Sequence, residues 1–382
     1  MDLSLDRVAK LYRKLKLKPF PFIHIAGTNG KGSTSAILSS ILSQKNQTGL
    51  FSSPHFLKPS DCISINNKPV SEELYETARQ YVLDNDDYSC TLFEIQTCVA
   101  AYLFQDLDIC VIECGLGGLN DATNVLEGKI CTVFTSISLD HTNVLGSTIE
   151  EISKNKCGIM RSNVPVISVH QNLLVESILE STALSIGSPL CWSNNCIKHD
   201  NRFECSGFKF KSELKGRIQL ENMGLAIAVC KELQIDDEDV RVGLEECKIR
   251  GRMSFIAPNI LVDGAHNEAA IKMLVSEINS DKVSWIVSLS GGRNISILDP
   301  ILNRNPKDEI FFVPFPLPEE MPWVTCWDYA HEAVLNNCVP CESVWKALDL
   351  SSGSMIVVCG SLYLVAEVFR NYTEKNKIAG EM

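Results

Sequence analysis

The stretch FIHIAGTNGKGST, residues 22–34, joins a short apolar run to a glycine-rich turn. The run FIHIA has the length and composition of a buried strand, and apolar residues between Ile37 and Leu42 then recur at helical spacing. This stretch therefore predicts a strand, a tight turn and a helix, which is the unit that builds parallel sheets.

The same alternation continues along the chain and predicts the α/β class. Apolar runs of about four to eight residues, separated by helical patterns, indicate parallel strands covered by helices on both faces. The runs are GLFSS (49–53), DICVIE (108–113), CTVFTSI (131–137), PVISV (165–169), NILVDGAH (259–266), VSWIVSLS (283–290), EIFFVPF (309–315) and MIVVCGSL (355–362).

The length of the chain favours two domains. Single hydrophobic cores stop growing at about 250 to 300 residues, and this chain has 382. The second series of apolar runs starts after residue 255, and the preceding segment contains KIRGRM and ends at Pro258. We therefore expect domains at 1–250 and 251–382, with a hinge near the boundary and a cleft between them.

Composition excludes several classes of protein. The net charge of -12 argues against nucleic-acid binding, which needs clustered Lys and Arg. No apolar stretch reaches the roughly 20 residues of a membrane span. The sixteen cysteines are scattered and follow no secretory signal, so we expect free thiols in a reducing compartment. These observations predict a cytoplasmic protein and leave a mitochondrial pool open.

The turn GTNGKGST has the chemistry of a phosphate-binding loop. Glycines let backbone N–H groups approach phosphate oxygens, the helix N-terminus adds a favourable dipole, and Lys31 can reach the β and γ oxygens. The turn is one residue shorter than the Walker pattern, and glycine-rich turns also occur as purely structural features. With a lysine in this context, we expect a nucleotide to contact Gly27, Thr28, Asn29, Gly30, Lys31, Gly32, Ser33 and Thr34.

Polar residues also follow other predicted strands. Ser53 comes after GLF, Glu113 ends DICVI, and His141 follows CTVFTSIS after a short interval. The carboxyl ends of parallel strands share one edge, where ligands bind. Singly, Ser53 could begin a turn and His141 could cap a loop. Jointly, they predict a magnesium site beside the phosphates.

Lys156 lies at an unusual position for a lysine. Ser147 and Glu150 predict a capping box, and Ile149, Ile152 and Ile159 place Lys156 on the apolar face of the helix that follows. Lysines usually remain in water, and a buried one beside cations has a lowered pKa. Reaction with carbon dioxide would turn such a lysine into a carbamate anion suited to magnesium.

Eight motifs occur here in the order GTNGKGST, SSPHF, IECGLGGLNDATNV, SLDHTNVLG, KCGI, GRIQLEN, GRM and VDGAHN. Together they resemble the folylpolyglutamate synthase and dihydrofolate synthase branch of the Mur ligase superfamily, from about residue 22 to residue 370. DCISINNKPV, EEMPW and VVCGSLYL are most similar to the monofunctional dihydrofolate synthases of fungal type. The resemblance implies a P-loop ATPase domain with a parallel sheet, followed by a smaller Rossmann-like α/β domain.

The resemblance also implies how the site is divided. Residues 30–33 would hold ATP, and Lys156 would be carbamylated. Two magnesium ions would bind Ser53, Glu113 and His141, and the nucleotide would also contact Asn222, Arg252 and Asp263. The pterin would lie near Phe93, Glu94, Thr97, Gly117, Gly118 and Asp121. His266 would face glutamate, and the catalytic residues would be Lys31, His141, Lys156 and His266.

Some positions depart from the family pattern. The family usually has Arg-Leu where this chain has Leu119 and Asn120. This chain therefore lacks one positive charge near the pteroate. Other departures are Arg250, Asn155, Cys157 and Arg293. The expected catalytic set is intact, so these changes bear on substrate affinity more than on the reaction.

Three functions follow from these residues. The first is a dihydrofolate synthase that uses ATP to join L-glutamate to dihydropteroate through an acyl phosphate. The second is a folylpolyglutamate synthase that performs the same chemistry on tetrahydrofolate. The third is an ATP-binding regulatory relative without ligase activity. We expect small-molecule partners alone, no nucleic acid, no membrane and a monomer, as in many Mur relatives.

Overall fold

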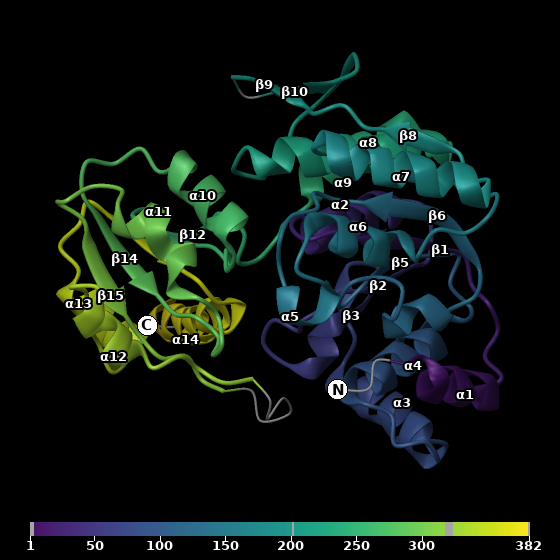
Figure 1. Ribbon diagram of the computed structural model, residues 1–382, viewed down its shortest axis with the longest axis horizontal. Coiled ribbons are helices and arrows are strands. Elements are labelled where there is room, and N and C mark those ends of the chain that lie inside the picture. The colour runs from purple at the N-terminus through teal and green to yellow at the C-terminus, as the bar shows by residue number, and fades with distance from the viewer. Residues whose placement is uncertain (1–3, 201, 318–323, 381–382) are drawn as a thin grey trace. The chain divides into compact units, whose positions relative to one another are not determined.

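The computed structural model describes residues 4–200, 202–317 and 324–380, with residues 373–380 as helical backbone only (Figure 1). The chain forms two compact units, Met1–Glu213 with Ile218–Lys248, and Leu214–Arg217 with Ile249–Met382. The short piece joins the second unit because Arg217 pairs with Glu277 at 3.3 Å. The ammonium of Lys215 also lies 4.5 Å from the centroid of the Phe255 ring.

An eight-stranded sheet forms the centre of the first unit, in the order β4-β3-β2-β5-β1-β6-β7-β8. Six strands from β2 to β8 in this order are parallel, and β3 and β4 extend one edge in antiparallel fashion. The strands are β1 (Phe22–Ala26), β2 (Thr48–Phe51), β3 (Ile63–Ile65), β4 (Lys68–Pro69), β5 (Ile109–Glu113), β6 (Lys129–Phe134), β7 (Val166–Ser168) and β8 (Leu190–Trp192).

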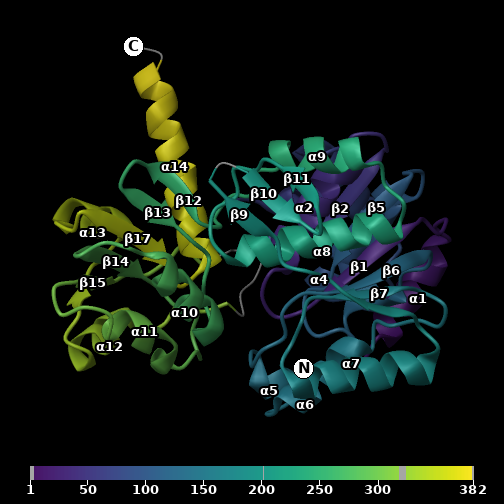
Figure 2. The ribbon, with the colours of Figure 1, turned by 90° about the horizontal axis from the view of Figure 1, so that it is seen from above.

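Nine α-helices of the described residues surround this sheet. They are α1 (Asp6–Leu15), α2 (Lys31–Leu42), α3 (Glu72–Asp84), α4 (Leu92–Phe104), α5 (Thr142–Leu145), α6 (Ile149–Cys157), α7 (Leu173–Ile186), α8 (Ile218–Glu232) and α9 (Asp237–Glu246). Short 3-10 turns η1 (Pro59–Cys62) and η2 (Ala122–Val125) complete the unit. Figure 2 shows α9 and α7 on opposite sides of the strands.

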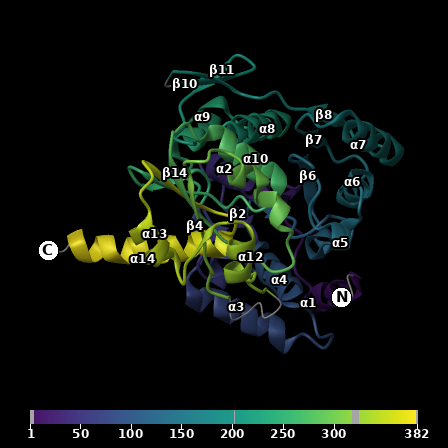
Figure 3. The same cartoon turned by 60° about the vertical axis from the view of Figure 1, so that its left-hand side comes forward.

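The burial of β1 explains why both faces of the sheet are covered. All five of its residues are buried, so apolar side chains point to both sides. On one side α2 packs against α8 and α9. On the other side Phe22 joins a core with α1 and α4, and Ala26 joins a core with α6 and α7. Figure 3 shows α3 beside α4.

A small antiparallel sheet of order β11-β10-β9 contacts α9 through β11. It consists of β9 (Ile197–His199), β10 (Arg202–Cys205) and β11 (Phe208–Phe210). Phe203 and Phe210 stack at 5.6 Å between ring centroids and are both buried. This sheet is therefore attached to the unit by one apolar face.

The second unit has a six-stranded sheet in the order β12-β13-β17-β14-β15-β16, parallel except for β12. Its strands are β12 (Ser254–Ala257), β13 (Ile260–Val262), β14 (Val283–Val287), β15 (Glu309–Phe312), β16 (Val339–Pro340) and β17 (Met355–Cys359). Its helices are α10 (Glu268–Glu277), η3 (Ile295–Leu298), α11 (Asp299–Leu302), α12 (Tyr329–Leu335), α13 (Val344–Leu350) and α14 (Leu362–Gly380). The predicted α/β class and both series of apolar strands are confirmed.

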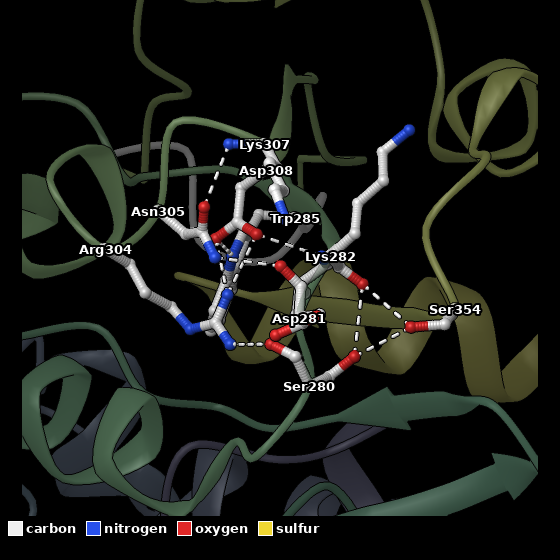
Figure 4. Close-up of polar contacts among 10 residues, drawn as sticks. Ser280, Asp281, Lys282, Trp285, Arg304, Asn305, Lys307, Asp308 and Ser354 are labelled. Atoms are coloured by element: carbon white, nitrogen blue, oxygen red, sulfur yellow. Dashed lines mark hydrogen bonds and ion pairs between the residues drawn. The ribbon is translucent and has the colours of Figure 1, made fainter.

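A buried ion pair closes the second sheet at the edge where its strands begin (Figure 4). Arg304 donates to both carboxylate oxygens of Asp308, at 2.9 and 2.7 Å. The same carboxylate accepts from Trp285 Nε1 at 3.0 Å and from the backbone N–H of Val283 at 2.9 Å. The Asp308 side chain is only 1% exposed. Its charge is thus held inside the protein by four hydrogen bonds from three donor groups.

We expect Asp308→Ala to lower the free energy of unfolding by about 3 kcal/mol or more, because the change leaves Arg304 without its buried partner. Urea denaturation of the whole chain measures the effect. The matched control is Glu268→Ala, which breaks an exposed pair with Lys272 and should cost less than about 1 kcal/mol. Equal costs for the two variants would contradict this account.

Glu309 lies next to that pair and has a lowered pKa. Partial burial raises its pKa, but hydrogen bonds from Lys282, Ser352 and Ser284 outweigh burial and lower it to about 2. Folding therefore favours the charged form of this carboxyl. Its stabilising contribution is present above the usual glutamate pKa and is lost as pH falls toward 2.

Glu309→Gln should consequently destabilise the protein at neutral pH, with a penalty that shrinks as the wild-type carboxyl becomes protonated. Urea denaturation of both proteins between pH 7 and about pH 3 measures the difference. A penalty that stays constant across this range would show that the charge of Glu309 contributes nothing.

Candidate active site

The carboxyl ends of four parallel strands meet along one edge of the first sheet. Ile25 of β1 pairs with Glu113 of β5, and Ala26 pairs with Phe134 of β6. Phe51 of β2 pairs with Ile112 of β5. Gly27, Ser53 and Glu113 therefore leave neighbouring strands at nearly the same level, as their places in the sequence predict.

The glycine-rich loop between β1 and α2 is anchored to the segment after β6. Thr28 and Asn29 donate their backbone N–H groups to Ser136 O at 2.7 and 3.3 Å. A Cβ on Gly27 would lie 1.9 Å from the Thr135 hydroxyl, so only glycine fits there. The loop is thus held before any ligand binds.

The N-terminus of α2 has the features of an anion site. Its N-cap is Gly30, at φ 94°, and no side chain of the described residues caps it. The first N–H groups of a helix have no partner within the helix and attract negative charge. The first turn of α2 contains no acidic residue. These observations fit the phosphate groups of a nucleotide.

Two lysine ammonium groups meet at one carbonyl oxygen of this loop. Lys31 Nζ lies 3.1 Å from Gly27 O, and Lys156 Nζ lies 2.8 Å from the same oxygen. Lys31 also donates to Thr28 O at 3.2 Å. The acceptors in these three contacts are neutral carbonyl oxygens, so the positive charge at the loop is available to an anion.

Lys156 is buried at the end of α6, as its position on the apolar face predicts, with 3% of its surface exposed. Burial lowers its pKa to about 7, and the nearby Lys31 adds to the effect. A neutral amine is therefore accessible at physiological pH. By contrast, Lys154 is 63% exposed and pairs with Glu150.

The predicted capping box of α6 is wrong by one residue. The N-cap is Thr148 instead of Ser147, and the partner carboxylate is Glu151 instead of Glu150. Thr148 has the extended backbone that an N-cap needs, and its hydroxyl accepts from Glu151 N at 3.2 Å. The Glu151 carboxylate accepts hydrogen bonds from the backbone N–H groups of both Ser147 and Thr148. These backbone donors therefore have partners when the helix begins after Thr148.

Glu113 is the one carboxylate among the three expected metal ligands, and it lies beside the loop. It is 4% exposed and accepts from Ser53 N at 3.3 Å. A Cβ on Gly32 would lie 3.5 Å from its carboxylate, so this side chain borders the first turn of α2. A buried carboxylate beside a phosphate cradle fits magnesium, which combines one or two carboxylates with phosphate oxygens and water.

His141 lies farther along the segment after β6. It precedes α5 at φ 51°, its side chain is 47% exposed, and its Nε2 is 4.0 Å from Asp140 Oδ2. Within the described ranges, no cluster of three or more His, Cys, Asp and Glu side chains is arranged for a metal. A metal here would thus depend on substrate oxygens as well as protein ligands.

Asn222 of α8 lies against the loop. Its Oδ1 accepts from the Thr34 hydroxyl at 3.4 Å and would lie 2.5 Å from a Cβ on Gly30. Gln219, one turn earlier, donates to Ser33 Oγ at 3.5 Å and accepts from Asn222 at 3.0 Å. Gln219 was not predicted from the sequence, although its place three residues before Asn222 on a helix was a usable signal.

The glycine-rich segment after β5 packs directly on α6. A Cβ on Gly118 would lie 2.7 Å from the Lys156 carbonyl oxygen, and one on Gly117 would lie 2.3 Å from Asn155 Oδ1. Asp121 holds the segment, because it accepts from the N–H groups of Leu116 and Thr123 at 2.8 and 3.0 Å. Burial raises the pKa of Asp121, although hydrogen bonds oppose the shift. These residues therefore position Lys156.

The expected pterin contacts on α4 have structural partners. Glu94 completes a capping box with Thr91 and accepts from Arg7 Nε at 3.3 Å. The Thr97 hydroxyl donates to Phe93 O at 2.8 Å. The Phe93 ring stacks on Phe51 at 5.8 Å between centroids. These side chains hold α4 next to the end of β2.

His24 is a further polar residue beneath the loop. Its Nε2 lies 2.8 Å from the hydroxyl of Thr123, which donates in turn to Asp121. Burial lowers the pKa of His24 well below its usual value, and Lys129 and Arg161 add to the effect. His24 is thus neutral, and its Nε2 shares a hydrogen bond with Thr123. This role for His24 was not predicted from the sequence, and the only sign of it there was a histidine inside the apolar run FIHIA.

In the second unit, the expected residues surround the end of β13. Asp263 accepts from Met253 N and from Ala265 N, each at 2.8 Å. Burial raises the pKa of Asp263, while Arg252 opposes the shift. His266 Nδ1 donates to Gly264 O at 2.7 Å. Arg252, Asp263 and His266 therefore share one loop region of this unit.

Two family models match the chain. Residues 25–230 match the Mur ligase middle domain, and residues 252–371 match the C-terminal domain of dihydrofolate synthetase. None of the helices in the described part of the chain is both long and apolar enough to cross a membrane.

Relatives match the chain over nearly its whole length. Dihydrofolate synthetase of Saccharomyces cerevisiae is 35% identical, covering 97% of this chain and 98% of its own. Dihydrofolate synthase/folylpolyglutamate synthase of Bacillus subtilis is 30% identical, covering 96% and 94%. The structure of Escherichia coli FolC in complex with DHPP and ADP has a TM-score of 0.87 at 26% identity, covering 98% and 94%.

A second solved structure is a bifunctional folylpolyglutamate synthase/dihydrofolate synthase with Mn, AMPPNP and L-glutamate bound. It has a TM-score of 0.84 at 28% identity and covers 97% of this chain and 94% of its own. With both family models and these full-length relatives in agreement, this chain belongs to the dihydrofolate synthase/folylpolyglutamate synthase family of Mur ligases.

Proposed function

We propose that this chain is an ATP-dependent ligase that joins L-glutamate to 7,8-dihydropteroate and releases dihydrofolate, ADP and phosphate. The observation that carries the proposal is the meeting of Lys31 and Lys156 at Gly27 O, beside the uncapped N-terminus of α2. A relative named for dihydrofolate synthesis, 35% identical over the full length, supports the choice of substrate.

The first step is phosphoryl transfer from ATP to the pteroate carboxylate, which forms an acyl phosphate. Such transfer depends mainly on positioning and charge stabilisation. The N–H groups at the start of α2 hold the phosphates, and Lys31 leaves its carbonyl partners to neutralise the transferred group. Asn222 and Gln219 keep the loop in place from α8.

The second step joins the amino acid to the activated carboxylate. The glutamate amine attacks the acyl phosphate carbon, and phosphate leaves from the tetrahedral intermediate. Arg252, Asp263 and His266 are the residues of the second unit that we assign to nucleotide and glutamate. Phe93, Thr97 and the segment held by Asp121 are assigned to the pterin.

Magnesium, when bound, supplies charge neutralisation at the phosphate oxygens. We propose Glu113, Ser53 and His141 as its protein ligands, with two ions in the complete site. Burial of Glu113 at the edge of the loop supports this assignment. The Mn bound in a solved relative supports a divalent ion.

We also propose that Lys156 is carbamylated in the active protein. Its amine is buried and its pKa is lowered to about 7, so the neutral form that reacts with carbon dioxide is accessible. The carbamate would place a negative charge next to Lys31 and a ligand near the metal. Replacing the Lys156 ammonium by a carbamate removes the electrostatic repulsion between two neighbouring ammonium groups.

The ligase is proposed to act as a monomer in the cytoplasm. The loop and the residues that contact it, such as Asn222 and Lys156, belong to one chain. The sixteen cysteines are all free in the structure, which suits a reducing compartment.

Folylpolyglutamate synthesis is the second candidate, because the Bacillus subtilis relative carries both activities in its name. Both candidates share the site described above and differ in the acceptor. Leu119 stands at the edge of the glycine-rich segment and is half exposed, so it is available to contact an acceptor.

Phosphate release with ATP, magnesium and glutamate separates the candidates. We expect turnover with dihydropteroate and little with tetrahydrofolate. Turnover only with tetrahydrofolate would reject the first candidate in favour of the second. ATP binding without turnover on either acceptor would point to a regulatory relative and reject both.

Lys156→Ala should reduce turnover by about 100-fold or more, because a charge-stabilising group is lost from the site. Short carboxylates such as formate should restore part of the rate if the lysine acts as a carbamate. The matched control is Lys154→Ala, an exposed lysine on the same helix, which should keep the wild-type rate. An unchanged rate in Lys156→Ala would remove this residue from the mechanism.

A further inference from the structure

Two cysteines of the small antiparallel sheet lie directly opposite each other. β9 and β10 pair with the register Arg202↔His199, Phe203↔Lys198 and Glu204↔Ile197. Extending this register by one residue places Cys205 opposite Cys196. Opposite residues in antiparallel strands have Cα atoms about 4.5 to 5.5 Å apart, which is within the span of a disulfide.

The two side chains point to the same face of this sheet. Side chains alternate along a strand, so Cys205 shares a face with Phe203, and Cys196 shares one with Lys198. Lys198 Nζ lies 5.9 Å from the centroid of the Phe203 ring, which confirms that this neighbouring pair is on one side. Cys196 and Cys205 are each 3% exposed. Both thiols are therefore enclosed together on the buried face.

The backbone of Cys196 favours the closer type of cross-strand pair. Its N–H donates to Leu220 O of α8 at 3.0 Å, so this N–H does not bond across the hairpin. Side chains approach most closely in cross-strand pairs of this non-hydrogen-bonded kind. The position thus suits a bond between the two sulfurs.

The thiols differ in acidity because they interact. A hydrogen bond with Cys196 lowers the pKa of Cys205, against the effect of burial, and Ser206 and Lys231 assist. The same hydrogen bond, together with burial, raises the pKa of Cys196. Cys205 is therefore the better nucleophile of the pair at neutral pH.

We propose that Cys196 and Cys205 are a reversible redox modification site, oxidised to a cross-strand disulfide by small-molecule disulfides. The Cys205 thiolate attacks one sulfur of the small disulfide, forms a mixed disulfide and expels one thiolate. The Cys196 thiol then loses its proton, attacks the Cys205 sulfur and expels the second thiolate. Two protein thiols are oxidised, and one small disulfide is reduced to two thiols.

The site is attached to the helix that contacts the phosphate loop. Besides the bond from Cys196 to Leu220, Gly224 of α8 approaches so closely that a Cβ there would lie 2.0 Å from Asn194 O. The segment before β9 therefore lies on the same helix as Asn222. Oxidation would close the hairpin covalently at this point of contact.

The test uses the full chain equilibrated in mixtures of reduced and oxidised glutathione, followed by alkylation, digestion and mass spectrometry. We expect a peptide pair linked through Cys196 and Cys205 that increases with the oxidised fraction and disappears with dithiothreitol. A Cys191→Ser variant is the control, because Cys191 is the exposed cysteine next in sequence, and it should retain the link. Recovery of both Cys196 and Cys205 as alkylated thiols while Cys191 is fully glutathionylated would overturn the proposal.

Single variants test the assigned order of attack. In Cys196→Ser the mixed disulfide with glutathione should be trapped on Cys205, at least about ten-fold faster than on Cys196 in Cys205→Ser. Circular dichroism and urea midpoints like those of the wild type show that each variant is folded. Equal trapping rates in folded variants would overturn the order of the two steps, and absence of trapping in both would overturn the site.

Discussion

The carbonyl oxygen of Gly27 accepts from two lysine ammonium groups, and the rest of the first unit is arranged around this contact. Bringing two positive charges to one neutral oxygen is unfavourable unless an anion joins them. Burial lowers the pKa of Lys156 to about 7, and the charge of Lys31 contributes to the shift. A nucleotide's phosphates, or a carbamate on Lys156, would relieve the repulsion, so the site is prepared for negative charge.

Close backbone packing keeps Lys156 at that oxygen. Gly117 and Gly118 let the segment after β5 lie directly on α6, and Gly158 allows Leu119 to approach from the same segment. Asp121 fixes the segment, with support from Thr123 and His24 beneath it. A Cβ on Gly118 would meet the backbone of Lys156, and one on Gly158 would meet the backbone of Leu119, so a side chain at either position would push the segment and α6 apart. These glycines thus help to hold Lys156 at the glycine-rich loop.

The acidity of the cysteine thiols also depends on how the chain packs around them. Most are buried, and burial raises the pKa and keeps the thiol unreactive, as for Cys230 and Cys247. Cys196 and Cys205 differ because strand pairing brings two thiols together and makes one of them more acidic. The acidity of these two thiols therefore depends on their mutual hydrogen bond as well as on burial.

Periodicity and local residue types were enough to predict the α/β class, the strands, the tight turn between β1 and α2, and the buried face of α6. These signals act over a few neighbours in the chain, so they can be read without knowing which segments meet. The same local reasoning placed the capping box one residue early. Ser147 and Thr148 are both residue types that favour an N-cap, and only the backbone geometry distinguishes them.

Which side chains meet depends on the folding of the whole chain. Gln219 touches Ser33, Leu214–Arg217 join the second unit, and Cys196 faces Cys205. Each of these depends on strand order, register or helix packing, which bring together residues far apart in the chain. The contacts among Gly27, Lys31 and Lys156 combine both levels, since the residue types are local but their common carbonyl oxygen is fixed by the packing of α6 against the sheet.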